Sequence, residues 1–202
     1  MDVTPLSDGC LGIWKTEEQE SELRKIAGTV LCGDLSDAES PKRRLEKAAV
    51  RALLAEMLRY MGVEDSVSIL YHDDGRPYMN SSLFISISHT DGYAAVILNR
   101  KGRAGVDIEV RSPRALKLVE RFESEGASYS DPDSATLCWS AKESVFKLVG
   151  KKVADFRETM HIPPFYPTEG GNLTVTLCWD GHYGCRTVGY RVREGFVLTW
   201  TY

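Results

Sequence analysis

A long amphipathic helix, predicted from Ser40 to Gly62, is the feature that most constrains this fold. Ser40-Pro41 is a favourable helix start because proline suits the first turn, and Gly62 is a favourable stop. Between them, apolar residues recur at three- and four-residue spacing, the period of one helix face: Val50, Leu53, Leu54, Met57, Leu58 and Met61. Segments that favour strands stand on both sides of this helix, and their order decides the fold class.

The first half of the chain predicts strands at 10–15, 67–71, 83–88 and 93–98 and a short polar helix at 17–31. Asp91-Gly92 indicates a hairpin between the last two strands, and 73–77 is a turn by the same chemistry. After a link at 101–103, the second half predicts a strand at 104–110, helices at 112–122 and 135–149, a loop at 124–133, and strands at 173–179, 183–193 and 196–202. This order favours an α+β fold over a doubly wound α/β sheet, with an N-terminal lobe at 1–100 and a C-terminal lobe at 101–202.

The composition excludes several classes of protein. Hydrophobic residues at 43% and charged residues at 27% are ordinary globular values, unlike those of collagen-like or disordered chains. No apolar run approaches the roughly 18 residues of a membrane span, and the acidic N-terminus is unlike an export signal, so we expect a cytoplasmic protein with no membrane partner. The net charge of −4 provides no basic field for nucleic acid. Five cysteines without a C-x-x-C pair indicate buried, reduced thiols.

The segment Gly105-Val106-Asp107-Ile108-Glu109 carries the first chemical signal. Because side chains alternate along a strand, Val106 and Ile108 are expected to face a core, while Asp107 and Glu109 point together the other way. Their Cα atoms would lie roughly 6.5–7 Å apart, so that both carboxylates could share one hard divalent cation. A half-solvated strand with acids outward is the alternative.

The second signal is the segment 139–147, Trp-Ser-Ala-Lys-Glu-Ser-Val-Phe-Lys. On a helix, Trp139, Glu143 and Lys147 stack at i, i+4 and i+8, off the apolar face. A surface stripe with a Glu–Lys pair worth about 0.3–0.5 kcal/mol is the alternative, but it does not explain the tryptophan. A third acid beside a lysine suits Mg²⁺ bound to phosphate oxygens.

Basic residues of the first half form the third signal. On the long helix, Arg51 lies one to two turns from Arg43 or Arg44, and Arg76 lies in a turn. These side chains could bind a phosphate by forked hydrogen bonds. His89, which follows Ser88 at a strand end, could donate another hydrogen bond. A solvated basic face and a turn-capping histidine are the alternatives.

In their order along the chain and in their residue patterns, these segments resemble the 4′-phosphopantetheinyl transferases, of the two-lobed type that activates surfactin-synthetase-like enzymes. The matching residues are Lys42-Arg43-Arg44 with Arg51, Gly75-Arg76-Pro77, Ile87-Ser88-His89, 105–109, and 139–143 with Lys147. The resemblance implies two similar α+β lobes in a pseudo-twofold arrangement, each a small antiparallel sheet packed with helices, with the active site at their junction. It also implies transfer of the phosphopantetheine arm of coenzyme A to a serine of an apo acyl or peptidyl carrier protein, with release of adenosine 3′,5′-bisphosphate.

The resemblance further implies a role for each residue. Asp107, Glu109 and Glu143 would ligate Mg²⁺, which Mn²⁺ could replace, and Lys147 would contact the phosphates. The nucleotide and its 3′-phosphate would be held from the N-terminal lobe by Arg51, Arg76, Ser88 and His89, with Arg43 or Arg44 assisting. Glu143, or a water bound by the metal, would be the base. Two departures from the family pattern are the run 123–127, where an auxiliary acid cannot be placed, and Lys151, which stands where a second glycine is usual.

Three further expectations concern partners and rival functions. We expect a monomer, and the 112–122 helix would present Arg114, Lys117 and Arg121 to an acidic carrier protein unless it is merely a solvated basic face. A Mg²⁺-dependent phosphodiesterase that delivers water is one rival function. A module that binds coenzyme A or a carrier protein without catalysis is the other.

Overall fold

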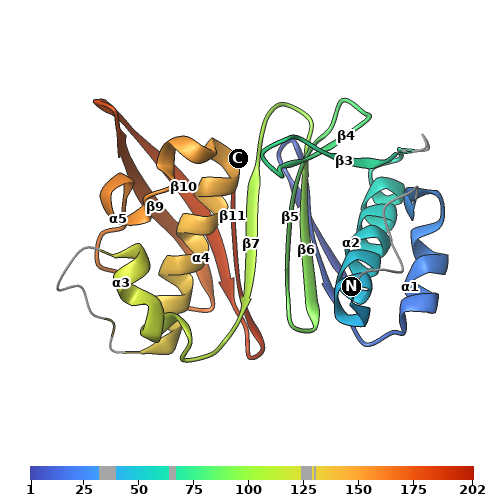
Figure 1. Cartoon of the computed structure of the whole chain (residues 1–202), viewed down its shortest axis with the longest axis horizontal. Coiled ribbons are helices and arrows are strands. Elements are labelled where there is room, and N and C mark those ends of the chain that lie inside the picture. The colour runs from blue at the N-terminus through green and yellow to red at the C-terminus, as the bar shows by residue number, and fades with distance from the viewer. Residues whose placement is uncertain (32–39, 64–66, 124–128, 130) are drawn as a thin grey trace. The chain divides into compact units, whose positions relative to one another are not determined.

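The computed structural model describes residues 1–31, 40–63, 67–123, 129 and 131–202. The chain divides into two compact units, Met1–Ala104 and Gly105–Tyr202. Each unit combines an antiparallel sheet with helices, which confirms the predicted α+β class (Figure 1). In these ranges, no helix has both the length and the apolar character needed to cross a membrane.

The first unit is built on a four-stranded antiparallel sheet. Its strand order is β1 (Asp2–Leu6), β2 (Gly9–Lys15), β6 (Tyr93–Asn99) and β5 (Phe84–Thr90). Strands β3 (Ile69–Tyr71) and β4 (Pro77–Met79) form a separate pair. Helix α2 (Pro41–Tyr60) covers one face of the sheet, and α1 (Glu20–Ala27) packs on α2 and continues into the 3₁₀ turn η1 (Gly28–Leu31) (Figure 1).

Helix α2 confirms the amphipathic helix predicted between residues 40 and 62. The Ser40 side chain caps it by accepting a hydrogen bond from the Arg43 backbone N–H, and Pro41 occupies the first turn. Val50, Leu53, Leu54, Met57 and Leu58 are all at most 3% exposed in the core of this unit. Burial of each such side chain is worth about 1.5–3 kcal/mol, so packing on the sheet stabilises the helix.

The second unit is built on a five-stranded antiparallel sheet. Its order is β7 (Gly105–Val110), β11 (Phe196–Thr201), β10 (His182–Val192), β9 (Gly170–Trp179) and β8 (Met160–His161). Helix α4 (Pro132–Val149) packs on it (Figure 1). The shorter elements are η2 (Ala115–Leu118), α3 (Val119–Phe122), η3 (Lys151–Val153) and α5 (Phe156–Thr159).

Two elements of the second half differ from prediction. The single helix expected at 112–122 is wrong: it is η2 followed by one turn of α3, because Leu118 leaves helical geometry at φ −115° and ψ 5°. Helix α4 begins at Pro132 rather than at 135, since the Asp131 carboxylate caps the Ser134 N–H. The remaining loop residues, 124–128 and 130, lie outside the described ranges.

The predicted burial of the cysteine thiols is confirmed for Cys10 and Cys138 and is wrong for Cys185, which is exposed.

Candidate functional site

Helix α4 approaches β7 so closely that residue 105 must be glycine. A Cβ atom at Gly105 would lie 1.8 Å from the Ser144 carbonyl oxygen. The helix-covered face of β7 therefore carries Gly105 and, by alternation, Asp107 and Glu109. Asp107 and Glu109 thus share one face, as predicted, and Val106 and Ile108 are buried. The expectation that the acidic face points outward is wrong for Asp107, which is only 4% exposed.

Polar contacts join successive same-face positions of β7 to α4. The Lys147 ammonium donates to the Asp107 carboxylate at 2.8 Å and to the Val106 carbonyl at 2.9 Å. The Trp139 indole N–H donates to Glu109 at 3.0 Å. The Trp139 ring packs 5.5 Å from Phe122 at the edge of the core, so its predicted place off the apolar face is wrong. The second signal segment thus meets the first along one helix–strand contact.

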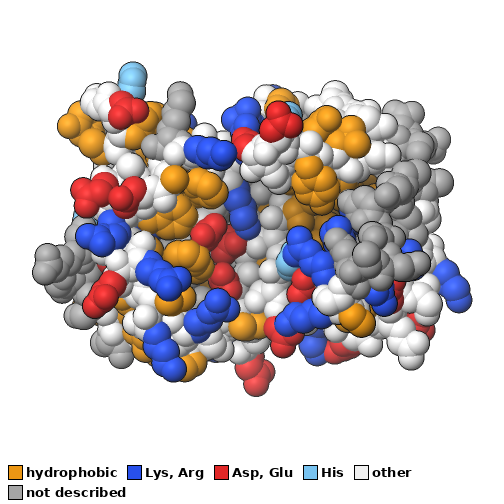
Figure 2. Space-filling view, viewed as in Figure 1, with side chains coloured by type: hydrophobic (Ala, Val, Ile, Leu, Met, Phe, Trp, Pro, Cys, Tyr) orange, Lys and Arg blue, Asp and Glu red, His pale blue; other side chains and the backbone are white. Residues whose placement is uncertain are grey.

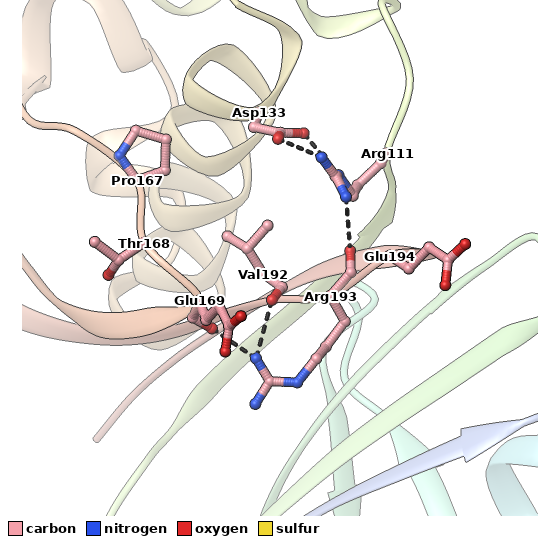
Figure 3. Close-up of a pocket in the computed structure, with 8 residues that line it drawn as sticks. All are labelled: Arg111, Asp133, Pro167, Thr168, Glu169, Val192, Arg193 and Glu194. Carbon is pink, nitrogen blue, oxygen red and sulfur yellow. Dashed lines mark hydrogen bonds and ion pairs between the residues drawn. The ribbon is translucent and has the colours of Figure 1, made fainter.

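Arg111, just beyond β7, extends this contact to the first turn of α4. Its guanidinium donates to both oxygens of Asp133, at 2.8 and 2.5 Å, and to the Arg193 carbonyl oxygen at 3.4 Å (Figure 3). Arg111, Asp133 and Arg193 also line an open pocket of this unit (Figure 3). Paired, planar contacts of this kind fix geometry better than a single contact does. The pair therefore ties the end of β7 to the start of α4.

Glu143 lies on α4 one turn from both Trp139 and Lys147. It makes no hydrogen bond or ion pair with any residue in the described ranges. Burial, and after it the negative charge of Asp107, raise the Glu143 pKa to about 7, while Lys147 opposes this rise. Burial and Asp107 also raise the pKa of Glu109, against the Trp139 hydrogen bond. The site therefore holds two glutamates, Glu109 and Glu143, whose charged forms are disfavoured by burial and by the Asp107 charge.

Lys142, the first lysine of the 139–147 segment, has a structural role that the sequence did not reveal. Its side chain is fully buried, and its ammonium donates to the Phe122 and Phe156 carbonyl oxygens at 2.5 and 3.4 Å. It also pairs with Glu123 at 3.0 Å. Lys142 thus ties α4 to α3 and α5, whereas Lys147, one and a half turns later, faces the acids. The helical period alone separates these two lysines, and it could have been used to find this difference.

The three carboxylates have the donor chemistry of a magnesium site. Within the described ranges, no group of three or more His, Cys, Asp or Glu side chains has an arrangement that could hold a metal ion. Carboxylate oxygens are nevertheless the preferred donors for Mg²⁺. Because the charge of Asp107 raises the pKa of both Glu109 and Glu143, a cation would relieve this repulsion. Asp107, Glu109 and Glu143 therefore fit a divalent cation by chemistry.

In the first unit, the structure brings Arg43 and His89 together across 46 residues of sequence. The Arg43 Nη1 atom lies 3.2 Å from His89 Nε2, and Glu46, one turn along α2, lies 3.5 Å from His89 Nδ1. Lys42 pairs with Asp91 in the turn after β5 at 3.0 Å. The N-terminal turn of α2 and the end of β5 thus form one polar cluster, in which Glu46 was not predicted.

The other predicted nucleotide-binding residues have different partners. Arg44 donates to Glu20 of α1 at 3.1 Å, and Arg76 pairs with Asp74 in its own turn at 2.6 Å. Arg51 is 2% exposed and donates to the Lys47 carbonyl oxygen at 2.9 Å. Ser88 is buried and, by strand alternation, lies on the opposite face of β5 from His89.

Comparison with known families now adds to this geometry. The family described as "4'-phosphopantetheinyl transferase N-terminal domain" matches residues 35–99, in the first unit. The family described as "4'-phosphopantetheinyl transferase superfamily" matches residues 103–200, nearly all of the second. The chain belongs to the 4′-phosphopantetheinyl transferase superfamily. Its superfamily region therefore contains Asp107, Glu109, Glu143 and Lys147.

Individual relatives agree with this membership. The chain is 34% identical to "Enterobactin synthase component D" of Salmonella typhi over 121 residues, which are 55% of this chain and 50% of that protein. The protein of the same name from Salmonella typhimurium is 30% identical over 144 residues, 67% of this chain and 57% of the relative. A Synechocystis sp. protein with a provisional 4′-phosphopantetheinyl transferase name is 26% identical over 122 residues, 54% of this chain and 49% of the relative. The chain thus spans about half the length of these relatives.

Proposed function

We propose that this chain transfers the 4′-phosphopantetheine arm of coenzyme A to a serine of an apo acyl or peptidyl carrier protein. The observation that carries the proposal is the β7–α4 contact, where three carboxylates and Lys147 gather in a chain of this superfamily. A diphosphate that binds there would be a polyanion facing one lysine and three acids, so a divalent cation is required to balance the charge. Mg²⁺ held by Asp107, Glu109 and Glu143, with Mn²⁺ as a substitute, would neutralise the diphosphate when bound.

In the proposed step, the serine Oγ attacks the phosphorus that carries the pantetheine arm. A new P–O bond forms, the bond from that phosphorus to the bridging oxygen breaks, and adenosine 3′,5′-bisphosphate leaves with the bond's electron pair. Glu143 accepts the serine proton. This role is supported by its position one turn from Lys147 and by its lack of a hydrogen-bond partner within the described ranges.

Lys147 would stabilise the charge that builds up on the phosphate oxygens. Its ammonium lies between two acceptors of β7, the Asp107 carboxylate and the Val106 carbonyl oxygen. A lysine binds phosphate as a point charge through three rotatable donors, so it can contact a phosphate oxygen from this position without a new backbone arrangement. Trp139 would keep Glu109 oriented through the indole N–H.

In the first unit, we propose that Arg43 and His89 contact a phosphate of the nucleotide, because they form the cluster in which a cation and an imidazole meet. Arg44, Arg51, Arg76 and Ser88 stay as secondary candidates for the nucleotide. The sequence left open whether Arg43 or Arg44 contacts the nucleotide, and this proposal chooses Arg43.

Intact-mass spectrometry tests the proposal. The chain is incubated with coenzyme A, Mg²⁺ and a panel of apo carrier proteins, beginning with an acyl carrier protein, the substrate of the holo-[acyl-carrier-protein] synthase reaction. We expect one phosphopantetheine to be added, and none to be added to a carrier whose serine is replaced by alanine. Turnover of coenzyme A without any carrier would instead show a phosphodiesterase. Binding without turnover would show a non-catalytic module.

A further inference from the structure

The contacts of His89 with Arg43 and Glu46 indicate which nitrogen of the His89 imidazole carries the proton. A guanidinium has only N–H donors and stays charged, so Arg43 can only donate to His89 Nε2 at 3.2 Å. His89 Nε2 therefore accepts, and the imidazole is neutral with its proton on Nδ1. That nitrogen faces the Glu46 carboxylate at 3.5 Å, while the same carboxylate oxygen lies 3.9 Å from Arg43. Glu46 is thus placed between the histidine and the arginine.

A phosphate monoester would reverse the role of His89 Nε2. Phosphate oxygens are acceptors, so a phosphate between Arg43 and His89 would bind both only if Nε2 became a donor. A shift of the single imidazole proton from Nδ1 to Nε2 would leave a bare nitrogen facing the Glu46 carboxylate. Uptake of a second proton avoids this repulsion, because an imidazolium donates from both nitrogens, to phosphate at Nε2 and to Glu46 at Nδ1. Above pH 7 the monoester is almost wholly a dianion, since its second pKa is about 6, so this proton comes from solvent.

We propose that Glu46 is a positioning residue that prepares His89 for proton-coupled binding of a phosphate monoester. The inference rests on the proposed function for the identity of the ligand, which would be the 3′-phosphate of coenzyme A. The Glu46 charge offsets the positive charge of Arg43 beside the imidazole and stabilises the imidazolium once the phosphate has bound. Its role is to keep this binding effective at pH values where a histidine beside an arginine would stay neutral.

Among the described residues, the neighbouring charges do not provide an alternative proton in this range. Lys42 of α2 and Asp91 of the turn after β5 face the cluster and pair with each other at 3.0 Å. The Asp91 carboxylate raises the pKa of Lys42, which keeps the lysine charged throughout the neutral range. The β6 residue opposite His89 is Ala94, which does not titrate. Among the described groups of this cluster, His89 is therefore the one to which we assign the proton uptake.

Calorimetry with a pair of ligands tests the proposal. Coenzyme A and 3′-dephospho-coenzyme A are titrated into the intact chain between pH 6 and pH 8.5, in two buffers of different ionisation enthalpy. The difference between the ligands cancels everything that occurs at the diphosphate. We expect coenzyme A to bind with uptake of about one proton at pH 8 and 3′-dephospho-coenzyme A with about none.

Glu46→Gln keeps the size of the side chain and an acceptor for Nδ1 but removes the charge. We expect it to weaken coenzyme A binding about fivefold at pH 8 and hardly at all at pH 6, with 3′-dephospho-coenzyme A unaffected. Glu56→Gln is the matched control, because Glu56 lies on the same helix and pairs with Arg59 instead. A merely structural role for Glu46 would weaken both ligands equally at every pH. That result, or equal proton uptake by both ligands, would overturn the proposal.

A second measurement separates this proposal from the proposed function. NMR follows the His89 imidazole while adenosine 3′,5′-bisphosphate is added at pH 8, a probe that needs no transfer reaction. Protonation of His89 in a chain that modifies no carrier would leave the cluster's role standing and refute the transferase. Phosphopantetheine transfer with an imidazole that stays neutral would refute the role of Glu46 and His89 alone.

Discussion

Replacement of Glu143 by glutamine should stabilise the ligand-free protein above neutral pH while it abolishes transfer. The folded-state pKa of Glu143 is about 7 against an ordinary 4.5, because burial and the Asp107 charge disfavour the carboxylate. Between these two pH values the folded chain binds more protons than the unfolded chain. Stability associated with Glu143 is therefore fully present below pH 4.5 and is lost as the pH rises through 7.

The expected size of this loss follows from the two pKa values. The full difference corresponds to about 3 kcal/mol of unfolding free energy at pH 8, and solvent at the partly open site reduces it to about 1–2 kcal/mol. Glu143→Gln has no charge to bury. It should therefore be more stable than the wild-type chain by about 1–2 kcal/mol at pH 8 and equal to it at pH 4.5.

Urea unfolding at pH 4.5, 6 and 8 without divalent cations measures this difference. Glu120→Gln on α3 is the matched control, since Glu120 is exposed and the variant removes the same charge from a solvated position. Added Mg²⁺ should raise the wild-type stability at pH 8 more than that of Glu143→Gln, if Glu143 is one of the metal ligands. A variant no more stable than wild type at pH 8 would refute the burial of a repelled carboxylate at this position.

Other substitutions probe the remaining contacts. Asp107→Asn should abolish transfer and lower the unfolding free energy by about 1–3 kcal/mol, because Asp107 is buried and accepts a hydrogen bond from the Lys147 ammonium. Denaturation measures the loss of stability and intact mass the loss of transfer. A fully active variant would exclude Asp107 from the site. Arg111→Met should lower kcat with little change in the KM for coenzyme A, since it removes the contact that holds the start of α4 to β7. Arg111→Lys should restore only part of the rate. An unchanged rate in both variants would show that the Arg111–Asp133 pair does not position the acids. Arg114→Glu with Lys117→Glu should raise the KM for an acidic carrier and flatten its salt dependence, because both residues are exposed and the charge of Arg114 acts on Glu109. Over α3, Lys and Arg side chains lie on the surface among acidic ones (Figure 2). An unchanged carrier KM across ionic strength would eliminate this surface.

Local patterns in the sequence determined much of this protein. Helix α2 and the hairpin of β5 and β6 were predicted because apolar spacing, Ser-Pro and Asp-Gly act within a few residues. The split of residues 112–122 into η2 and α3 was missed, because basic and apolar spacing there is compatible with one continuous helix. The residue types of the candidate site were likewise predicted from the sequence, since carboxylates, lysines and arginines have the same donor and acceptor chemistry in any fold.

Tertiary structure alone decided how these groups are used. Alternation placed Asp107 and Glu109 on one face of β7, but only the close approach of α4 over Gly105 made that the covered face. Helical spacing could separate Lys142 from Lys147, but only packing against Phe122 showed that Lys142 is structural.

The same is true of the basic cluster in the first unit. Arg43 and Arg44 are equivalent in sequence, and it is the path of β5 that brings His89 to Arg43, while α1 brings Glu20 to Arg44. Glu46 carried no signal of its own, because a glutamate one turn after an arginine is common on helix surfaces. Contacts across 46 residues depend on how sheet and helix pack, and a sequence records such packing only through the sum of all its buried side chains.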